Sequence, residues 1–374
     1  MKLGFFTSYN CGIVLWAKIG TLNRELALYR KLGELGIEVH IFTLERKRDI
    51  GDVVSDSVFR GLILHCLYPN WLPFNRFLAL VLMPIFLILN KKFGKTMDVL
   101  KTNQGHAGIH VYLAAKMWGR PYVSRSGYIL NEQLHNRKSR PLKDVVQAWF
   151  ERIVMHHASI CFVPSEYHLS WCRVNLKLSR LECIPNNVDT DIFKPDERTR
   201  SDCVVSVGRV VAMKRQNMIL EACKKANVPM VLVGDGPCLE DIKRNADKIS
   251  AKLFALGRVD NMQLPKVYAD SLIYVIASEY EGHPKTLIEA MSCGCVCVGT
   301  KNPGIQNQIV DGENGLLVED NVDAIANAIR SIVADENLSS RLREGARRYA
   351  LEHFALLSLA QKEVQILESI ANQR

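Results

Sequence analysis

The chain alternates short runs of β-branched and aromatic residues with longer stretches of helical periodicity. This alternation predicts parallel sheets covered by helices. The predicted strands are 3–7, 39–43, 62–67, 99–102, 122–125, 160–163, 181–184, 204–207, 230–233, 253–255, 272–276 and 296–298. The predicted helices between them include 22–35, 109–117, 142–157, 216–226, 265–269 and 285–291. From Val322 to its end the chain is expected to be helical, and its last stretch, 351–370, is amphipathic.

One polar segment interrupts this alternation. PNNVDTDIFKPDERTRSD (185–202) is rich in Pro, Asn and charge, and it predicts a connection between two domains. We therefore expect an α/β fold of two doubly wound, Rossmann-like domains: residues 1–190, with a helix at 352–374 packing back on them, and residues 191–351. In such sheets ligands bind at the carboxyl ends of the strands. This architecture alone suits a dehydrogenase, an epimerase, a phosphorylase or a glycosyltransferase.

Charge is distributed unevenly between the two halves. Residues 1–190 carry 25 Lys and Arg against 14 Asp and Glu, whereas residues 191–374 carry 23 against 25. The basic half is expected to face an anionic partner or to lie near an anionic membrane surface. No basic stripe interleaved with aromatic residues is present, so we expect no nucleic-acid partner.

The eleven cysteines show no paired C-x-x-C spacing, and the sequence opens with a predicted strand rather than a secretion signal. Reduced thiols and a cytoplasmic location are therefore expected. The basic first half predicts, in addition, peripheral contact at the inner face of the membrane. Cys293, Cys295 and Cys297 lie in a predicted helix end, glycine turn and buried strand. There cysteine serves as a small apolar residue, so we do not expect a metal cluster.

The most apolar segment is FLALVLMPIFLIL (77–89), which is followed by Lys91 and Lys92. It is too short to span a bilayer, which takes about twenty residues. Its length favours a buried helix of the first domain, kinked at Pro84. The alternative is a helix that lies in the membrane interface, anchored by Trp71 and the flanking cations.

The stretch SEYEGHPKTLIEAMSCG (278–294) predicts a strand end, a glycine-containing turn and a helix that opens at Pro284 or Lys285. The free N–H groups at the start of such a helix hold phosphate. Glu281 precedes the helix, and Glu289 lies roughly 7 Å further along its axis. Carboxylates accept paired hydrogen bonds from vicinal diols, so we expect one to meet a sugar and the other a ribose. An ordinary surface helix is the alternative.

A second stretch, SVGRVVAMKRQN (206–217), places two cations after a predicted buried strand. Gly208 ends the strand, Arg209 follows at once, and Lys214 comes five residues later, near a helix start. Two cations at the carboxyl end of a strand neutralise a diphosphate leaving group without a metal ion. The alternative is a pair of solvated loop charges.

These stretches resemble the retaining GT-B glycosyltransferases of family four, the glycosyl transferases of group 1. The resemblance is strongest over 185–318, where six signals occur in the order of the family. They are PNNVDTDIFKP (185–195), VGRVVAMK (207–214), VGDGP (233–237), LGRV (256–259), the pair Glu281 and Glu289, and DGENGLLV (311–318). The resemblance implies two domains facing across a cleft, with the last helix crossing back to the first. It also implies a nucleotide-diphosphate sugar as co-substrate and no metal or other cofactor.

By this resemblance, Arg209 and Lys214 bind the diphosphate of the donor, Glu281 contacts the transferring sugar and Glu289 holds the ribose. Further donor-binding residues are expected at Gly12, Gly208, Arg258, Val259, Gly282, His283, Lys285, Thr286 and Leu287. The sequence Asp189-Thr190-Asp191 spells the D-x-D of metal-dependent glycosyltransferases. It lies in the connecting segment, so these aspartates are expected to form a turn rather than to bind metal.

The sequence departs from the family at three places. Many relatives carry a glycine pair after the first strand, where Gly12 stands alone. The first-domain histidine of the family is absent from DVLKTNQGH, which places Lys101 and Asn103 there. Asn103 and His106 are the candidates for its catalytic role, although an ordinary loop histidine is an equal interpretation of His106. Asn307 replaces a carboxylate common in the family.

We expect front-face transfer with retention, in which the protein supplies positioning and charge stabilisation. Closure of the domains about 186–200 would exclude water. The acceptor is expected to be a glycan or a lipid-linked, anionic glycan, as in surface polysaccharide or glycoconjugate synthesis. Two alternatives remain: a nucleotide-sugar 2-epimerase, and a non-catalytic protein that binds nucleotide sugars. A dehydrogenase is disfavoured, because no G-x-G-x-x-G with a downstream acidic residue follows a strand.

Overall fold

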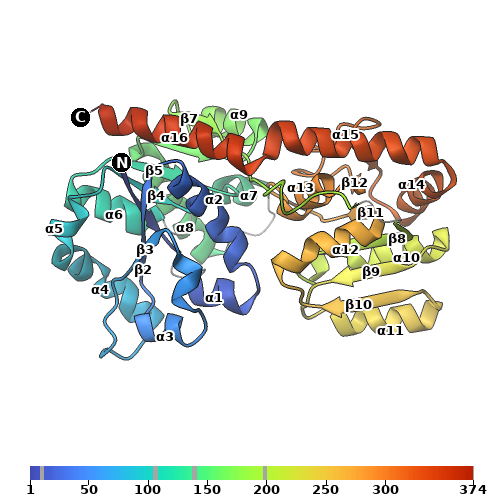
Figure 1. The fold of residues 1–374 in the computed structure, drawn as a ribbon, viewed down its shortest axis with the longest axis horizontal. Helices are drawn as coiled ribbons and strands as arrows, with labels where there is room; N and C mark the ends of the chain where they lie inside the picture. The colour runs from blue at the N-terminus through green and yellow to red at the C-terminus, as the bar shows by residue number, and fades with distance from the viewer. Residues whose placement is uncertain (9–11, 104–107, 137–140, 197–199, 374) are drawn as a thin grey trace. The chain divides into compact units, whose positions relative to one another are not determined.

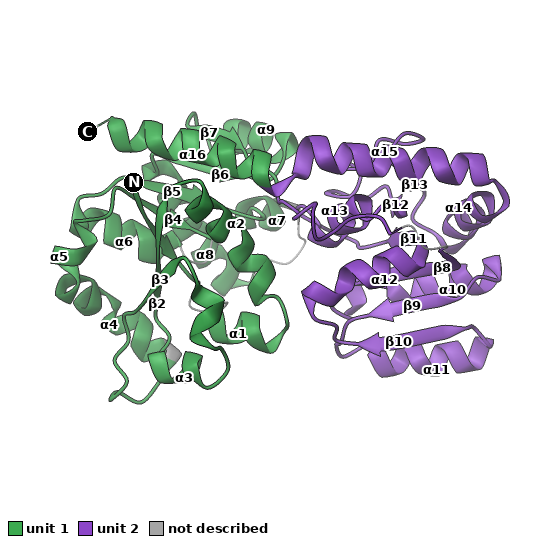
Figure 2. Ribbon diagram, in the orientation of Figure 1, with its two compact units in different colours: residues 1–185, 357–374 green, residues 186–356 purple. Residues whose placement is uncertain are grey.

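The computed structural model describes the whole chain except residues 9–11, 104–107, 137–140, 197–199 and 374. The chain forms two compact units, residues 1–185 with 357–374, and residues 186–356 (Figure 2). The units divide after Pro185 and Leu356, five residues before and after the expected boundaries. The difference arises because the predicted connection packs into the second unit. Val188 and Phe193 are buried in its core.

The first unit is built on a sheet of seven parallel strands (Figure 1). The strand order is β3-β2-β1-β4-β5-β6-β7. The strands are β1 (Lys2–Phe6), β2 (Glu38–Thr43), β3 (Leu62–Cys66), β4 (Val99–Thr102), β5 (Tyr122–Arg125), β6 (Ile160–Val163) and β7 (Leu181–Cys183). The order reverses between β1 and β4, and a ligand crevice is expected outside the carboxyl ends of those strands.

Helices cover both faces of this sheet. Phe5 stacks on Tyr29 of α2, with ring centroids 3.8 Å apart, whereas the neighbouring Phe6 lies 5.8 Å from Trp118 of α6. Because successive side chains of a strand point to opposite faces, α2 and α6 lie on opposite sides. The helices of this unit are α1 (Ile13–Lys18), α2 (Leu22–Glu34), α3 (Lys47–Gly51), α4 (Arg76–Leu89), α5 (Lys91–Gly94), α6 (Gly108–Trp118), α7 (Leu130–Asn136), α8 (Leu142–His157), α9 (Glu166–Asn175) and α16 (Leu356–Asn372).

The second unit repeats the design with six parallel strands in the order β10-β9-β8-β11-β12-β13. They are β8 (Ser201–Val207), β9 (Met230–Val233), β10 (Leu253–Gly257), β11 (Ser271–Ile276), β12 (Val296–Thr300) and β13 (Leu316–Val318). Its order reverses between β8 and β11. Its helices are α10 (Gln216–Ala226), α11 (Leu239–Ile249), α12 (Leu264–Asp270), α13 (Lys285–Ser292), α14 (Val322–Ala334) and α15 (Glu336–Phe354). The two-domain α/β fold expected from the sequence is confirmed.

Every predicted strand and helix is present within a few residues of its expected bounds, but short elements were missed. Strand β13 has only three residues, all half-buried, and therefore lacks a clear apolar run. Six helices were also missed, and most of them are short: α1, α3, α5, α7, α9 and α11. Helix α11 is longer and amphipathic, but more than half of its residues are charged. The chain from Val322 is helical as predicted, with breaks at Asp335 and Ala355.

The apolar segment 77–89 forms α4, with Pro84 inside it. One face, including Met83 and Leu87, is buried in the core of the first unit. The other face is exposed, and Phe77 retains 75% of its accessible surface. The expectation of a buried helix is therefore wrong for half of α4. Among the described residues, no helix combines the length and the apolar character needed to cross a bilayer.

Candidate active site

The candidate site of the second unit lies where its strand order reverses, in the loops that follow β8 and β11. Three glycines shape the loop after β8: one belongs to that loop and two belong to the loop after the neighbouring strand β9. Gly208, directly after β8, donates its N–H to the carbonyl of Val233, at 2.9 Å. A Cβ on Gly234 would lie 1.8 Å from the carbonyl oxygen of Gly208, and one on Gly236 would lie 2.2 Å from that of Val210. The VGDGP stretch is therefore glycine-rich because it packs against the backbone on both sides of Arg209.

Arg209 is exposed, and its backbone is held firmly. Its carbonyl accepts a hydrogen bond from the side chain of Gln216, at 3.0 Å, and the N–H of Val210 donates to Asp235. Its guanidinium makes no hydrogen bond or ion pair with the described part of the chain. The structure thus presents a fixed residue whose charge remains available to an anion.

Lys214 ends a short 3-10 turn after Arg209 and forms an ion pair with the carboxylate of Glu281. The N–H of Glu279 donates to the carbonyl of Met213, at 2.9 Å. Arg215 also pairs with Glu279, at 3.2 Å. The two stretches singled out in the sequence therefore meet in one cluster at the carboxyl ends of β8 and β11.

Glu281 is positioned by a turn that sequence reasoning missed. Its N–H donates to the carbonyl of Pro303, at 3.2 Å, and a Cβ on Gly304 would lie 2.0 Å from its carbonyl oxygen. Its carboxylate also accepts a hydrogen bond from Ser278, at 2.7 Å. The dipeptide Pro303-Gly304 is a turn signal, and Gly304 has the positive φ of +83° that favours glycine.

Helix α13 begins after Pro284, which occupies the N-cap position, and no side chain among the described residues caps it. A helix start that no side chain caps attracts anions through its positive dipole end. Thr286 is held by Tyr274, whose hydroxyl lies 2.8 Å from its Oγ1. The N–H of Leu287 donates to the carbonyl of Pro284, so this predicted ligand amide is already bonded within the helix.

Asn186 holds the loop that leads into α13. Its side chain donates to the carbonyl of His283, at 2.7 Å. The ring of His283 is buried against Phe354, with ring centroids 5.3 Å apart. The Asn-Asn pair after Pro185 marked this segment in the sequence, but which backbone group Asn186 would bind could not be predicted. Gly282 and Lys285 flank this position and are half-buried.

Glu289 is buried, with 2% of its surface exposed. Its two carboxylate oxygens accept hydrogen bonds from Asn261 and Tyr268, at 3.2 Å each. Burial, followed by the charge of Glu289, raises the pKa of Tyr268, so that hydroxyl remains a donor. Glu289 therefore positions two neighbouring elements. Its predicted contact with a ribose stays a prediction.

The residues expected against the base lie at the end of β10. Arg258 is exposed and pairs with Asp235 of the β9 loop, at 3.1 Å. Val259 is half-buried against the core cluster that contains Leu287. Both positions lie beside the glycine loops described above, because β10 neighbours β9 in the sheet.

Other sequence predictions for this unit concern possible metal ligands. Cys293, Cys295 and Cys297 are completely buried, and burial raises the pKa of all three thiols, that of Cys295 to about 11. They act as small apolar residues of the core, as predicted. The carboxylate of Asp189 accepts hydrogen bonds from the N–H groups of Asp191 and Ile192, at 3.1 and 3.3 Å, which makes it a turn former.

In the first unit, the structure places the residues that follow β4 in a polar network. Asn103 accepts a hydrogen bond from Tyr29, at 3.1 Å, and donates to Glu25, at 3.4 Å. Lys101 is completely buried and forms an ion pair with Glu363 of α16. Its ammonium is therefore not available to a substrate. His106 lies outside the described residues.

The two backbone amides that follow Gly12 are bonded within the first unit. The carboxylate of Glu45 accepts hydrogen bonds from the N–H groups of Ile13 and Val14, at 2.7 and 3.1 Å. A Cβ on Gly12 would lie 2.5 Å from this carboxylate. Gly12 is thus required by an internal contact of the first unit. Its predicted role in donor binding stays a prediction.

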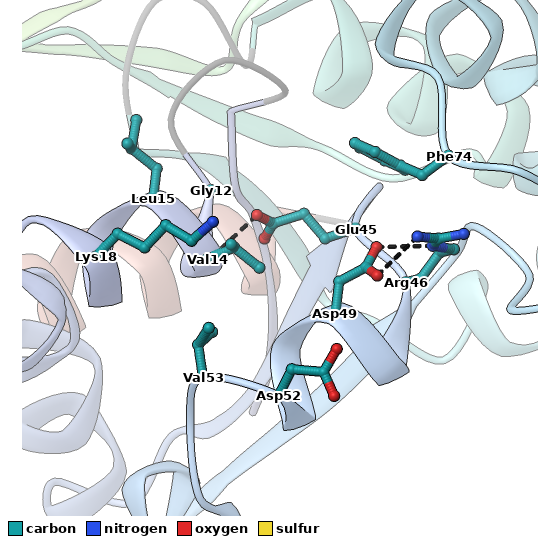
Figure 3. A pocket seen from close by; sticks show the side chains of 10 residues that line it. All are labelled: Gly12, Val14, Leu15, Lys18, Glu45, Arg46, Asp49, Asp52, Val53 and Phe74. Carbon is teal, nitrogen blue, oxygen red and sulfur yellow. Dashed lines mark hydrogen bonds and ion pairs between the residues drawn. The ribbon is translucent and has the colours of Figure 1, made fainter.

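Beside Glu45 the first unit contains a pocket of about 410 Å³ (Figure 3). Arg46 forms a two-point ion pair with Asp49, at 2.7 Å for both bonds, and its guanidinium lies 5.7 Å from the ring centre of Phe74. The charged lining consists of three carboxylates and two cations: Glu45, Asp49, Asp52, Lys18 and Arg46. The basic surplus of the first half is therefore not gathered in this pocket.

Two family models match the chain in succession. The glycosyltransferase family 4 model matches residues 24–192, and the glycosyl transferases group 1 model matches residues 187–349. Together they account for well over half of the chain.

Known proteins agree with this assignment. A GDP-mannose-dependent alpha-(1-6)-phosphatidylinositol monomannoside mannosyltransferase of Mycolicibacterium smegmatis is 28% identical in an alignment of 201 positions, which covers 46% of this chain and about half (52%) of that enzyme. An N-acetylgalactosamine-N,N'-diacetylbacillosaminyl-diphospho-undecaprenol 4-alpha-N-acetylgalactosaminyltransferase of Campylobacter jejuni is 23% identical over 93% of this chain and 94% of its own length. The structure of Anabaena HepE in complex with UDP covers 99% of this chain and 100% of its own, with 16% identity and a TM-score of 0.77.

Proposed function

Because the chain belongs to the GT-B glycosyltransferases of family 4 and group 1, we propose that it is a retaining, metal-independent enzyme for glycan assembly. It transfers a sugar from a nucleoside diphosphate donor to a glycan or lipid-linked acceptor in surface polysaccharide or glycoconjugate synthesis. The observation that carries the proposal is the cluster in the second unit. Three features lie at the carboxyl ends of β8 and β11: the Arg209 guanidinium, which has no ion-pair partner among the described residues, the Lys214 ammonium, and the start of α13, which no described side chain caps.

This cluster suits a diphosphate because Arg209, Lys214 and the positive end of α13 all lie at the carboxyl ends of β8 and β11. Arg209 and Lys214 would neutralise the negative charge that develops on the departing diphosphate, and the positive end of α13, with the amide of Thr286, would bind phosphate oxygens. The ion pair with Glu281 holds the Lys214 ammonium in place before the donor arrives. Such preorganised charges stabilise a transition state more than a ground state, since the leaving group gains charge as its bond breaks.

In the reaction we propose, the acceptor hydroxyl attacks the anomeric carbon on the face from which the diphosphate leaves. The bond from the anomeric carbon to the diphosphate oxygen breaks, and its electron pair stays on that oxygen. The new bond to the acceptor oxygen forms on the same face, which retains the configuration. The acceptor proton passes to the departing diphosphate, so no protein nucleophile is required.

The pocket of the first unit is our candidate for the acceptor. Phe74 and the Arg46–Asp49 pair supply an aromatic ring and polar groups, the combination that sugar rings and hydroxyls contact. Its three carboxylates outnumber its two cations, so the pocket favours a hydroxyl-rich or amino sugar over an anionic group. This revises the expectation that the basic half binds an anionic acceptor directly.

A second function deserves a test because of one observation. Lys101, at the position of the family histidine, is buried against Glu363, and Asn103 is bonded to Tyr29 and Glu25. A chain without a catalytic group in the first unit could bind nucleotide sugars without transferring them.

One experiment separates these functions. Thermal unfolding is measured with UDP-, GDP-, ADP- and dTDP-sugars, since a ligand that binds the native state raises its stability. The stabilising donor is then incubated with lipid-linked and free glycan acceptors, in the presence of a metal chelator, and the anomeric configuration of the product is determined. Transfer with retention in the chelator supports the proposal. Binding without transfer to any acceptor supports the second function, and an inverted product or a need for metal refutes the mechanism.

A further inference from the structure

Every exposed side chain of α4 that the structure describes is apolar. Phe77, Val81, Ile85, Ile88 and Leu89 are all more than half exposed, and they recur at the three- and four-residue spacing that places them on one side of a helix. Trp71, in the loop before α4, is 82% exposed. The opposite side of α4 packs into the core of the first unit. A solvent-facing helix normally carries charged residues on its outer side, so this face is anomalous.

A second helix of the same unit has a similar exposed stripe. Leu142, Val145, Val146, Trp149 and Phe150 of α8 are exposed, again at helical spacing. The inner side of α8, with Val154 and Met155, packs into the same core cluster as α4. We call the ten apolar side chains of the two stripes the α4–α8 face.

The two stripes belong to one layer because α6 lies between α4 and α8. The indole N–H of Trp118 on α6 donates to the carbonyl of Leu87 on α4, at 2.9 Å. On the other side, the ring of Tyr112 on α6 lies 5.3 Å from that of His157 on α8. A Cβ on Gly108 of α6 would lie 2.9 Å from Val154 of α8, so these helices are in close contact.

The charges around the α4–α8 face are almost all positive. Helices α4, α5 and α6 contain no Asp or Glu. Exposed cations lie on α5, α6 and α8: Lys91, Lys92, Lys116, Lys143 and Arg152. On α8, the carboxylate of Glu151 is buried and accepts hydrogen bonds from the backbone of Leu130 and Asn131, which leaves the half-buried Asp144 as the one outward acidic residue of these four helices in the described chain.

We propose that the α4–α8 face docks on the surface of an anionic lipid bilayer. Exposed apolar side chains enter the interface between headgroups and acyl chains, Trp71 and Trp149 lie at headgroup depth, and the lysines bind lipid phosphates. An apolar surface of this extent is rare on a protein that contacts only water. A second copy of the chain is disfavoured as the occupant, because lysine is depleted at the cores of protein–protein interfaces and like charges would oppose one another.

This inference does not depend on the proposed sugar transfer, and its test needs no donor or acceptor. The full chain is sedimented with vesicles of phosphatidylcholine and phosphatidylglycerol, and with vesicles of phosphatidylcholine alone. A blue shift of tryptophan fluorescence provides a second signal, because Trp71 and Trp149 are exposed. We expect binding to the anionic vesicles that weakens as salt is added.

Paired substitutions identify the face. Phe77→Gln with Ile85→Gln is expected to lower the vesicle partition coefficient about 10- to 30-fold, since two half-exposed apolar side chains lose their burial. Lys91→Gln with Lys92→Gln is expected to lower it about 25-fold, at about five-fold for each cation. The matched control is Phe254→Gln, on the exposed face of β10 in the second unit, where the side chain is 58% exposed.

Several outcomes would overturn the proposal. One is no binding of the wild-type chain to anionic vesicles; another is equal binding by the α4 variants and the control. Light scattering supplies a third: a dimer that the α4 substitutions dissociate, with no lipid binding, would assign the face to a second copy. Thermal unfolding of each variant must match the wild type, which distinguishes loss of docking from loss of fold.

Discussion

Replacing Glu363 by Gln is predicted to destabilise the first unit. Glu363 lies on α16 and is completely buried, as is Lys101 of β4, with which it forms an ion pair. Arg125 of β5 lies 3.6 Å from the second carboxylate oxygen and also donates to the carbonyl of Pro185, at 3.2 Å. One carboxylate therefore joins the last helix to two central strands, beside the residue where the chain leaves the unit. Its removal leaves two buried cations without a counter-charge.

The size of the effect follows from this burial. Breaking a buried ion pair by removing one partner costs about 3–5 kcal/mol. Burial already lowers the pKa of Lys101 to about 8, although Glu363 opposes the shift. Without Glu363, Lys101 can lose its proton and stay buried as a neutral amine. Deprotonating a lysine of ordinary pKa at pH 7 costs about 1.36 kcal/mol for each pH unit below that pKa, about 4.6 kcal/mol in all. The loss of stability from Lys101 therefore cannot exceed this value. Replacing both Lys101 and Glu363 by Met should restore part of the loss, since an apolar pair avoids the desolvation penalty of Lys101 but leaves Arg125 without the carboxylate.

The measurement is urea unfolding followed by tryptophan fluorescence. All five tryptophans lie in the first unit, so the signal reports on that unit alone. A loss of about 3–5 kcal/mol shifts the midpoint by roughly 1–2 M urea, for a slope of about 3 kcal/mol per M. Glu368→Gln is the control, because Glu368 is exposed on the same helix. The reasoning is refuted if Glu363→Gln unfolds at the same urea concentration as the wild type. It is also refuted if the stability lost by the double variant equals the sum of the losses of the two single variants.

Three further outcomes are expected. Lys214→Gln should lower kcat about 10²- to 10³-fold with the donor found by thermal shift. The neighbouring Arg215→Gln removes only surface ion pairs and should change kcat less than about two-fold. Equal losses in kcat would contradict the proposed contact between Lys214 and the diphosphate. Gly304→Ala should weaken nucleotide binding in calorimetry, because its Cβ would displace the Glu281 loop, while Gly312→Ala, at a similar φ of +77° with nothing within 4 Å, should not; matching affinities would disprove the positioning role. The free energy of unfolding of the first unit should rise between pH 8 and about 10. In this range Lys101 is protonated in the unfolded chain but largely deprotonated in the folded one, where its pKa is lowered to about 8, so the unfolded chain binds more protons. A Lys101→Met variant that keeps this rise would exclude Lys101 as its source.

The sequence by itself determined the fold class and predicted which loops form the candidate site of the second unit. Period-two and period-3.6 patterns persist through both units because each strand and helix buries one face or stripe in a core, and those patterns predicted most of the long elements; α9 and α11 were missed. The glycines and cations of 207–214 and 233–237 were identifiable as a set, because close backbone approach admits only glycine and a diphosphate calls for positive charge. These requirements concern residues that are close in sequence, so a short sequence motif is enough to identify them.

Only the tertiary structure decided which distant residues meet. That Lys214 pairs with Glu281, that Asn186 holds His283, and that Glu289 is enclosed by Asn261 and Tyr268 depends on the order of strands in the sheet. The same holds for Lys101, whose partner lies on the last helix of the chain. The sequence of a helix that is apolar on all sides does not show which side the core will cover. In α4, one side packs into the core of the first unit and the other side is exposed. Burial and pairing are properties of three-dimensional neighbours, and the chain brings those neighbours together only when it folds.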